Sequence, residues 1–264
     1  MSNRERVVAA LNSCFDDFHA LVGSLGDADW GVQSLCPEWT VRGVVEHLAG
    51  IEVVMTDWLP ESTETPIPFD RMVTFQTEAA EWSPEVLTAK VGEVLAVRRL
   101  ELAELTDAQF DSPALTPVGP ATYASFLGIR VFDFWVHQRD MAIPLGTLDA
   151  WTAGGDKAEI AMDEVNKSLG YIAGKKIGLP DGKSMTISTH GGVTRDMHVA
   201  VDGRASIVDS LSDPDVVLEA DSTAFIMLAC GRVDPQEQID AGNITWSGDD
   251  ELGEKAARNL RFTM

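Results

Sequence analysis

Apolar residues recur at steps of three and four along much of the first half of the chain, which is the spacing that places them on one face of a helix. Over residues 3–25 this repeat is formed by Val7, Leu11, Phe15 and Phe18. The same pattern predicts long helices over residues 41–59, 85–105 and 123–143, and a shorter one near residues 69–81. Four long helices with irregular connections indicate an antiparallel four-helix bundle.

Residues that favour helix ends stand at the borders of these segments. Thr40 and Thr122 are suited to cap the second and the fourth long helix, and Ser83 with Pro84 can start the third. Pro144 follows the fourth helix, where it would stop further helical backbone. The order of helices therefore follows from local signals as well as from periodicity.

The second half of the chain has a different pattern. One helix is expected near residues 154–173, and short β-branched segments bounded by Gly or Asp then predict strands. These strands cover residues 184–191, 194–203, 204–210, 215–221 and 243–248, and further helices are expected over 222–232 and 250–260. We therefore expect a two-domain α+β chain, with a helical bundle in residues 1–150 and a small α+β domain in residues 151–264.

One predicted helix carries more charge than its surroundings explain. In "GIRVFDFWVHQRDMAIPLG", residues 128–146, the polar residues Arg130, Asp133, His137 and Asp140 have helical spacing but lie among many apolar side chains. Asp133 and His137 are four residues apart, so they project from one face of the helix about one turn apart. A burial cost of this kind needs a compensating interaction.

A bound metal ion is one such interaction. His47 also lies in the middle of an apolar helix, and a bundle can bring the centres of two helices together. Imidazole and carboxylate are suitable ligands for a divalent first-row metal, and three protein ligands would leave a position open for water or substrate. The simpler alternatives are that His47 is a hydrogen-bonded core histidine and that Asp133 pairs with Arg130 or another arginine.

Composition narrows the possible functions. The 264 residues are 45% hydrophobic and 23% charged, which is typical of a globular protein, and their formal net charge of −22 argues against binding to nucleic acid or to an anionic membrane. With no apolar run of membrane-spanning length and no signal-like N-terminus, we expect a cytoplasmic location. The widely spaced Cys14, Cys36 and Cys230 predict no disulfide framework, and the absence of GxSxG, GxGxxG and Walker A motifs argues against serine hydrolases and common nucleotide sites.

Two segments resemble the signatures of a known family. "SLCPEWTVRGVVEHLAG", residues 34–50, and "RVFDFWVHQRDMAIPLG", residues 130–146, are similar to motifs of the mycothiol-dependent maleylpyruvate isomerase family, a branch of the DinB/YfiT-like metal-binding four-helix bundles. The C-terminal residues 228–264 resemble the sterol-carrier-protein-2-like (SCP2-like) domain that follows the bundle in this family. The resemblance covers nearly the whole chain.

The resemblance implies a set of site residues. The metal ligands of the family correspond to His47, Asp133 and His137, the implied metal is zinc, and mycothiol is the implied co-substrate. Asp133 stands where the maleylpyruvate isomerases have Glu. An arginine of the C-terminal domain assists the isomerase site, and Arg232 is its match here. Beyond these, Arg130 and Asp140 are candidates to support the ligands.

These residues predict a metal- and thiol-dependent enzyme that acts on a small electrophile. A metal-activated thiolate can add to a conjugated double bond and leave again, which gives cis–trans isomerisation, or it can stay attached, which gives an S-transferase. S-transfer is slightly favoured because it demands less of the substrate. The sequence identifies neither the electrophile nor the oligomeric state, and a structural role is favoured for Cys36.

Two other functions stay open at this stage. An SCP2-like domain can enclose an apolar tunnel, which would make the protein a carrier of apolar ligands with a vestigial bundle. Its candidate lining residues, for which core packing is the simpler interpretation, are Phe225, Ile226, Met227, Leu228 and Trp246. Alternatively, the same three ligands could support metal-assisted hydrolysis, in which case turnover would need no thiol.

Overall fold

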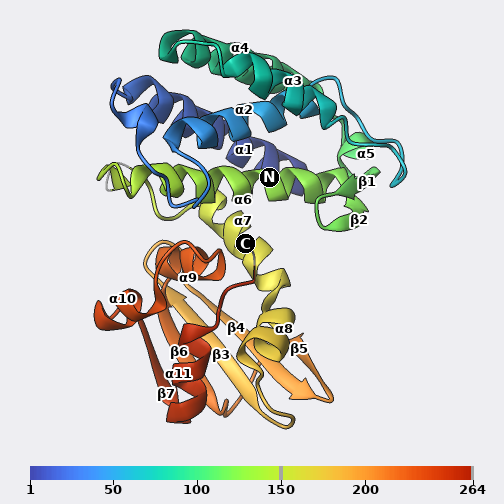
Figure 1. Ribbon diagram of the computed structural model, residues 1–264. Coiled ribbons are helices and arrows are strands. Elements are labelled where there is room, and N and C mark those ends of the chain that lie inside the picture. Colours follow the sequence, from blue (N-terminus) through green and yellow to red (C-terminus); the bar gives the residue numbers. More distant parts are fainter. Residues whose placement is uncertain (149–150, 263–264) are drawn as a thin grey trace. The chain divides into compact units, whose positions relative to one another are not determined.

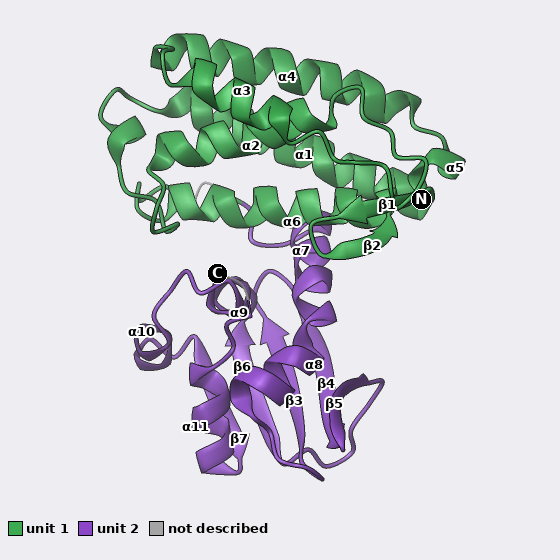
Figure 2. Ribbon diagram, turned by 45° about the vertical axis from the view of Figure 1, so that its right-hand side comes forward, with its two compact units in different colours: residues 1–151 green, residues 152–264 purple. Residues whose placement is uncertain are grey.

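The computed structural model describes residues 1–148 and 151–262. The chain divides into two compact units, residues 1–151 and residues 152–264, which we call the helical unit and the sheet unit (Figure 2). The predicted domain border after residue 150 falls at residues 149–150, which lie outside the described residues. Each unit is described by itself below.

Helices make up most of the helical unit (Figure 1). Its elements are α1 (Asn3–Ser24), the 3-10 turn η1 (Asp29–Gly31), α2 (Val41–Met55), α3 (Asp70–Ala79), α4 (Pro84–Glu104), α5 (Asp107–Phe110), β1 (Pro113–Thr116), β2 (Gly119–Thr122) and α6 (Tyr123–Ala142). The four long helices pack as a bundle in which both α1 and α2 contact α4 and α6, while α3 packs on α2. The predicted bundle is therefore confirmed.

Aromatic and small residues set the packing of the bundle. Phe15 and Phe18 of α1 meet Phe134 of α6 edge to face, with ring centroids 5.3 and 5.5 Å apart. On the other side of the bundle, a Cβ atom at Gly50 would lie only 2.9 Å from the Cγ atom of Met72, so a glycine allows α3 to pack closely on α2. The ring contacts hold α1 against α6, and the glycine lets α3 lie against α2.

Helix capping follows the sequence closely. The hydroxyl groups of Thr40, Ser83 and Thr122 accept hydrogen bonds from the backbone of the first turns of α2, α4 and α6, as predicted. The predicted end of α2 at residue 59 was wrong, since α2 ends at Met55. The chain turns at Asp57, whose φ of 53° is incompatible with continued right-handed helix, although the apolar Trp58 and Leu59 extended the pattern.

A short hairpin precedes α6 where only an irregular connection was expected. Strands β1 and β2 pair antiparallel, with Thr116 opposite Gly119, whose φ of 113° closes the turn. The sequence pattern did not predict these strands because the segment contains prolines and because each strand has only four residues. The hairpin leads directly into Thr122 and so defines where α6 begins.

The sheet unit combines one sheet with several helices. Its elements are α7 (Asp156–Lys167), α8 (Leu169–Tyr171), the π-helix η3 (Ile172–Ile177), β3 (Ser184–His190), β4 (Arg195–Asp202), β5 (Arg204–Val208), β6 (Val216–Asp221), α9 (Ser222–Ala229), α10 (Pro235–Asp240), β7 (Ile244–Gly248) and α11 (Asp250–Arg258). The strands form one sheet in the order β5-β4-β3-β6-β7, in which only the β3–β6 pair is parallel. Helix α11 packs on β6 and β7.

The predicted strands of this unit are all present, but three helical details were wrong. In place of one helix over residues 154–173, α7 ends at Lys167 and the separate short elements α8 and η3 follow it. In α8, Gly170 lies against the backbone of β5. Helix α9 ends at Ala229, before the left-handed Gly231. The six-residue α10 was missed because it has no buried residue to give a periodic pattern. The two-domain α+β fold class is nevertheless confirmed.

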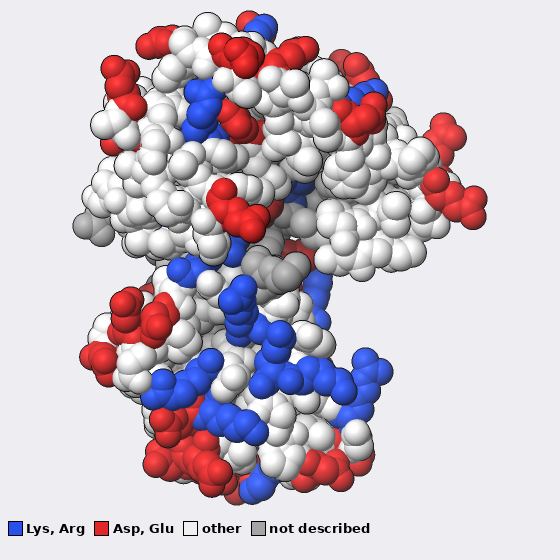
Figure 3. Space-filling model, in the orientation of Figure 1, with Lys and Arg blue, Asp and Glu red and all other residues white. Residues whose placement is uncertain are grey.

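The faces of the two units that Figure 3 shows differ in their charged side chains. Lys and Arg side chains gather on the visible face of the sheet unit, whereas Asp and Glu are scattered over the visible face of the helical unit (Figure 3). Within the part of the chain that the structure describes, no helix combines the length and the apolar character needed to cross a membrane.

Candidate metal centre

Two helices of the bundle bring the three predicted ligands together. His47 lies in the middle of α2, while Asp133 and His137 lie one turn apart on α6. Since α2 and α6 pack against each other, the predicted residues from distant parts of the sequence face the same point. His137 is buried, and the side chains of His47 and Asp133 retain 18% and 24% of their exposure, so the site is open on one side.

The distances between these groups suit a tetrahedral ion. Asp133 is 3.3 Å from Nε2 of His47 through Oδ2 and 3.2 Å from Nε2 of His137 through Oδ1. One ligand atom from each residue can be chosen so that all three lie within 4.8 Å of one another. Two ligand atoms bound tetrahedrally at about 2.0–2.1 Å lie roughly 3.3 Å apart, so the donor set fits Zn²⁺ or a similar divalent ion.

The protonation of the three groups follows from their mutual contacts. Burial acts to raise the pKa of Asp133, but the charges of His137 and Arg130 outweigh it and hold that pKa well below its ordinary value. Burial acts to lower the pKa of His137, but Asp133 raises it well above the ordinary value. Burial lowers the pKa of His47. The site therefore presents an ionised carboxylate and one neutral imidazole, and an incoming cation would replace the proton of His137.

Asp140 fixes the orientation of His137. The Nδ1–H group of His137 donates a hydrogen bond of 2.8 Å to Oδ2 of Asp140, which is fully buried one turn further along α6. This bond leaves Nε2 of His137 to face Asp133 and His47. The prediction that Asp140 supports a ligand is consistent with this contact.

Cys36 joins the same cluster from the loop before α2. Its Sγ–H donates to Oδ2 of Asp140 at 3.3 Å and lies 3.8 Å from Nδ1 of His137. Cys36, His137 and Asp140 form a second group with ligand-type atoms, but all three are buried and already hydrogen-bonded to one another. The loop is held in place by the backbone N–H of Leu35, which donates to the carbonyl oxygen of Asp140. The group with His47 is the better candidate because it is accessible.

Trp39 covers the two histidines. Its ring centroid lies 4.7 Å from that of His47 and 5.7 Å from that of His137. The same residue follows the loop that carries Cys36, and its carbonyl oxygen accepts hydrogen bonds from Gln33 and Ser34. An aromatic ring at this place shields the imidazoles from water. Trp39 was not among the predicted site residues.

Buried charges extend from Asp133 into the bundle core. Arg130, which lies one turn before Asp133 on α6, donates from Nη1 to Oδ2 of Asp133 and from Nε to Oε1 of Glu52 at 2.9 Å. The other carboxylate oxygen of Glu52 accepts from Nε of Arg98 on α4 at 3.0 Å, and Arg98 also pairs with Glu101. The side chains of Asp133, Arg130, Glu52, Arg98 and Glu101 therefore form a row in which negative and positive charges alternate. We call this row the buried charge chain.

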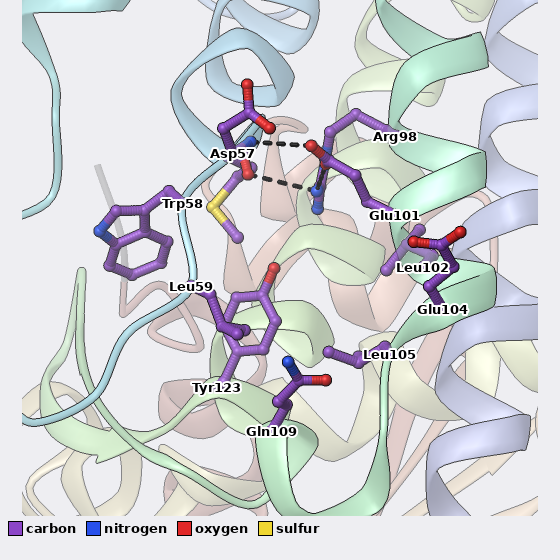
Figure 4. Close-up of a pocket in the computed structure, with 11 residues that line it drawn as sticks. Asp57, Trp58, Leu59, Arg98, Glu101, Leu102, Glu104, Leu105, Gln109 and Tyr123 are labelled. Carbon is purple, nitrogen blue, oxygen red and sulfur yellow. Dashed lines mark hydrogen bonds and ion pairs between the residues drawn. The ribbon is translucent and has the colours of Figure 1, made fainter.

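A cavity borders the far end of the buried charge chain (Figure 4). Its volume is about 300 Å³, and Arg98 and Tyr123 line it together with Trp58, Leu102 and Leu105. Figure 4 shows the Tyr123 ring and the Arg98 guanidinium group reaching toward each other from α6 and α4. Burial raises the pKa of Tyr123, so its hydroxyl group stays protonated and available as a donor.

Glu52 and Arg98 were missed by the sequence analysis, although a signal exists for both. Each interrupts an apolar stripe with helical spacing. On α2 the buried stripe consists of Val45, Leu48, Glu52 and Met55, and on α4 it consists of Val91, Leu95, Arg98 and Leu102. A charged residue on the buried face of each of two packed helices predicts an ion pair between them.

Of the sheet-unit residues that were predicted to act in function, Arg232 and the residues from Phe225 to Leu228 lie on α9 or shortly after it, and Trp246 lies on β7. Arg232 follows this helix, with its backbone N–H donating to Met227 and its Nη1 to the carbonyl oxygen of Cys230 at 3.1 Å. The four proposed tunnel residues from Phe225 to Leu228 are at most 2% exposed, as expected for core packing. Trp246 is half-buried and donates from Nε1 to Asp250.

Fold and site together define the class: a two-domain α+β protein whose helical bundle holds a candidate metal centre. The family model described as the mycothiol maleylpyruvate isomerase N-terminal domain matches residues 11–142, and the C-terminal domain model of that family matches residues 159–255. The chain therefore belongs to the mycothiol-dependent maleylpyruvate isomerase family, and the resemblance seen in the sequence is confirmed. Membership of this family supports the prediction of an isomerase-like enzyme, which stays a prediction for this chain.

Known relatives and structures show how far the similarity extends. Two uncharacterized proteins from two strains of Mycobacterium tuberculosis are each 26% identical over 131 residues, which is 50% of this chain. The match covers 63% of each relative, so the chain spans less than two thirds of their length.

The crystal structure of the mycothiol-dependent maleylpyruvate isomerase matches 94% of this chain and 93% of its own, with a TM-score of 0.61 and 16% identity. A variant of that isomerase in which one histidine is replaced by alanine matches over the same shares, with a TM-score of 0.59. At this identity the likeness shows the common fold.

Proposed function

We propose that the protein is a thiol-dependent isomerase that uses mycothiol, or a similar low-molecular-weight thiol, at a divalent metal held by His47, Asp133 and His137. Its substrate would be a small electrophile with a conjugated cis double bond, such as maleylpyruvate. The observation that supports this proposal is the convergence of three ligand-type side chains from α2 and α6, at separations that suit a tetrahedral ion.

Each residue of the proposed site has a separate role. Asp133 supplies negative charge, and Asp140 holds His137 so that Nε2 faces the ion position. A divalent cation at this point, for which Zn²⁺ is our choice, would keep the bound thiol ionised near neutral pH. Trp39 limits access of water from the side of the two imidazole rings.

The proposed reaction is an addition followed by an elimination. The thiolate sulfur forms a bond to one carbon of the conjugated double bond, and the displaced electron pair moves to the carbonyl oxygen. The remaining single bond rotates, the electron pair returns, and the carbon–sulfur bond breaks. The thiol is regenerated and the double bond becomes trans, so no oxidant or reductant is needed.

Arg232 is our candidate for binding an anionic group of the substrate. A guanidinium group can hold a carboxylate through two hydrogen bonds, whereas lysine can offer only a point charge. Arg232→Lys should therefore raise KM for a carboxylate substrate more than it lowers kcat. An unchanged KM would remove Arg232 from the site.

Metal content is the first test of the proposal. Protein purified without a histidine tag, analysed by mass spectrometry, should contain near-stoichiometric divalent metal in the wild type and little in His137→Ala and Asp133→Ala. His19→Ala is a matched control on α1 and should retain the metal. Wild-type protein that takes up no metal even after reconstitution would overturn the metal-dependent mechanism.

Activity with and without thiol is the second test. Metal-loaded protein should convert maleylpyruvate to its trans isomer only when mycothiol is added, with no net loss of thiol. Loss of thiol with formation of an S-conjugate would instead support the S-transferase that the sequence analysis favoured slightly, and turnover without thiol would support metal-assisted hydrolysis. Stoichiometric binding of a fluorescent fatty-acyl probe without metal would favour the carrier of apolar ligands. The cytoplasmic location and the exclusion of nucleic acid stay predictions.

A further inference from the structure

The buried charge chain raises the question of why a bundle core holds Glu52, Arg98 and Arg130. Their side chains are 0%, 2% and 4% exposed, so each charge has lost nearly all of its contact with water. A buried ion pair is often no more stabilising than apolar residues of the same size. Stability alone therefore does not account for this arrangement.

The hydrogen bonds within the buried charge chain are more specific than neutralisation of the charges requires. Glu52 uses one oxygen for each arginine, at 2.9 Å to Arg130 and 3.0 Å to Arg98. Arg130 is held further by its Nη2, which donates to the carbonyl oxygen of Leu48 at 3.3 Å, and by the ring of Phe134, whose centroid lies 4.9 Å from Cζ. The guanidinium group thus has contacts on several sides and little freedom to turn.

Because Arg130 is fixed in this way, it also fixes the carboxylate of the candidate ligand Asp133. Its Nη1 donates to Oδ2 of Asp133, which also lies 3.3 Å from Nε2 of His47, while Oδ1 of the same carboxylate faces Nε2 of His137. A carboxylate with one oxygen engaged by a fixed guanidinium group has only the other oxygen fully available to an ion. Such a ligand binds through one oxygen and leaves room in the coordination sphere.

We propose that Glu52 and Arg130 are positioning residues of the metal centre: Glu52 fixes Arg130, and Arg130 holds Asp133 so that its carboxylate binds the ion through a single oxygen. This inference rests on the proposed function. It explains how an aspartate, which is shorter than glutamate, is presented in a defined direction. Arg98 and Glu101 anchor the other end of the chain beside the cavity.

Arg130 could act on the metal centre through its charge or by positioning Asp133, and the two roles predict different changes in metal affinity when Arg130 is replaced. A positive charge beside the site repels a divalent cation, so by charge alone Arg130→Gln should bind the metal more tightly and Arg130→Lys should bind it equally. If Arg130 acts by position, both variants should bind more weakly, because neither side chain can bridge Glu52 and Asp133 as a guanidinium group does. Loss of such a supporting contact typically weakens metal affinity about 10–100-fold.

The experiment compares Zn²⁺ and Co²⁺ affinities of the wild type with those of Arg130→Lys, Arg130→Gln and Glu52→Gln, using competition with a chelator. We expect a loss of about 10–100-fold in each variant. Glu46→Gln is the matched control, since Glu46 lies on the same helix and pairs with Arg42, outside the buried charge chain. It should change the affinity less than about twofold. Circular dichroism and thermal melts of the metal-free proteins show whether each variant is folded.

The visible spectrum of bound Co²⁺ gives an independent readout. If Arg130→Gln frees the second oxygen of Asp133, the coordination number should rise and the absorption should weaken, which a purely structural role would not cause. Should Glu52→Gln not fold, the two Arg130 variants decide the question. Wild-type affinity and spectrum in both would overturn the inference while leaving the metal centre intact, whereas no binding by the wild type would overturn the proposed function and this inference together.

Discussion

The two units differ most in what they bury besides apolar side chains. Among the described residues, every buried charged side chain lies in the helical unit: Glu52, Arg98, Arg130, His137, Arg139 and Asp140. In the sheet unit, the buried polar residues of the described part are hydroxyl side chains, namely Thr186, Thr189 and Ser222. Its ion pairs, such as Lys183 with Asp215 and Arg195 with Glu159, are partly exposed.

This difference separates two ways of building a core. Burial of a charge costs free energy unless it is paired and hydrogen-bonded, whereas a buried hydroxyl group needs only one or two partners. The helical unit accepts that cost close to its candidate metal centre. The sheet unit avoids it and is closer to an ordinary apolar core.

Removal of one buried charge should show the largest contrast. Glu52→Gln leaves Arg98 and Arg130 without their shared carboxylate, and we expect a loss of about 3–5 kcal/mol in the free energy of unfolding. Thr189→Val in the sheet unit removes one hydroxyl donor at 3.3 Å from the carbonyl oxygen of Arg195 and should cost about 1 kcal/mol. Chemical denaturation followed by circular dichroism measures both. Equal losses would contradict the contrast between the units.

The contact between α11 and β7 in the sheet unit should be sensitive to added volume. A Cβ atom at Gly253 would lie 2.3 Å from Cδ1 of Trp246, so Gly253→Ala forces α11 away from β7 and should cost about 1–3 kcal/mol. The matched control is Gly23→Ala in helix α1, where nothing lies within 4 Å of the new methyl group. That variant should be neutral or slightly stabilising in thermal melts. A harmless Gly253→Ala would show that this packing is loose.

Helix caps should contribute equally in both units. Thr122→Ala removes the acceptor for the backbone N–H of Ser125 at the start of α6, and Asp221→Ala removes the acceptor for two N–H groups at the start of α9. We expect each to lower the free energy of unfolding by about 1 kcal/mol. The same denaturation assay measures both variants. A much larger effect at Thr122 would show that the helix ends, and not only the buried charges, differ between the two units.

The smallest effect concerns an exposed ion pair. Hydrogen bonds from Lys183 and Ser184 lower the pKa of Asp215, so its stabilising effect is present above the ordinary pKa of about 4 and is lost as the pH falls through the lowered value. Asp215→Asn should therefore destabilise the protein by less than about 1 kcal/mol at pH about 7 and by still less at pH about 3. The exposed Asp213→Asn serves as the control. A difference that grows on acidification would contradict this assignment.

Much of this architecture could be predicted from the sequence because local signals agree with tertiary packing. The caps at Thr40, Ser83 and Thr122 and the apolar stripes define the long helices, and β-branched segments define all five strands of the sheet. For the site, spacing alone places Asp133 and His137 together. The addition of His47 needed the resemblance or the general geometry of bundles, since no local rule links α2 with α6.

What could not be predicted depends on contacts between distant segments. Glu52 and Arg98 are 46 residues apart, and only packing of α2 on α4 turns two isolated charges into a pair. Trp39 lies in an irregular loop, so no periodicity points to its position over the imidazole rings. The end of α2 depends on the backbone of Asp57, which residue type alone does not reveal.

The spacing of polar residues along α6 also bears on how the gene can change. Arg130, Asp133, His137 and Asp140 follow each other at steps of three, four and three, so they remain aligned only while the helix keeps its number of residues. One inserted residue between Asp133 and His137 would rotate everything after it by about 100° and turn Nε2 of His137 away from its partners. Point substitutions elsewhere on this helix should therefore be tolerated far better than any insertion or deletion within it, and natural length variation should concentrate in the loops.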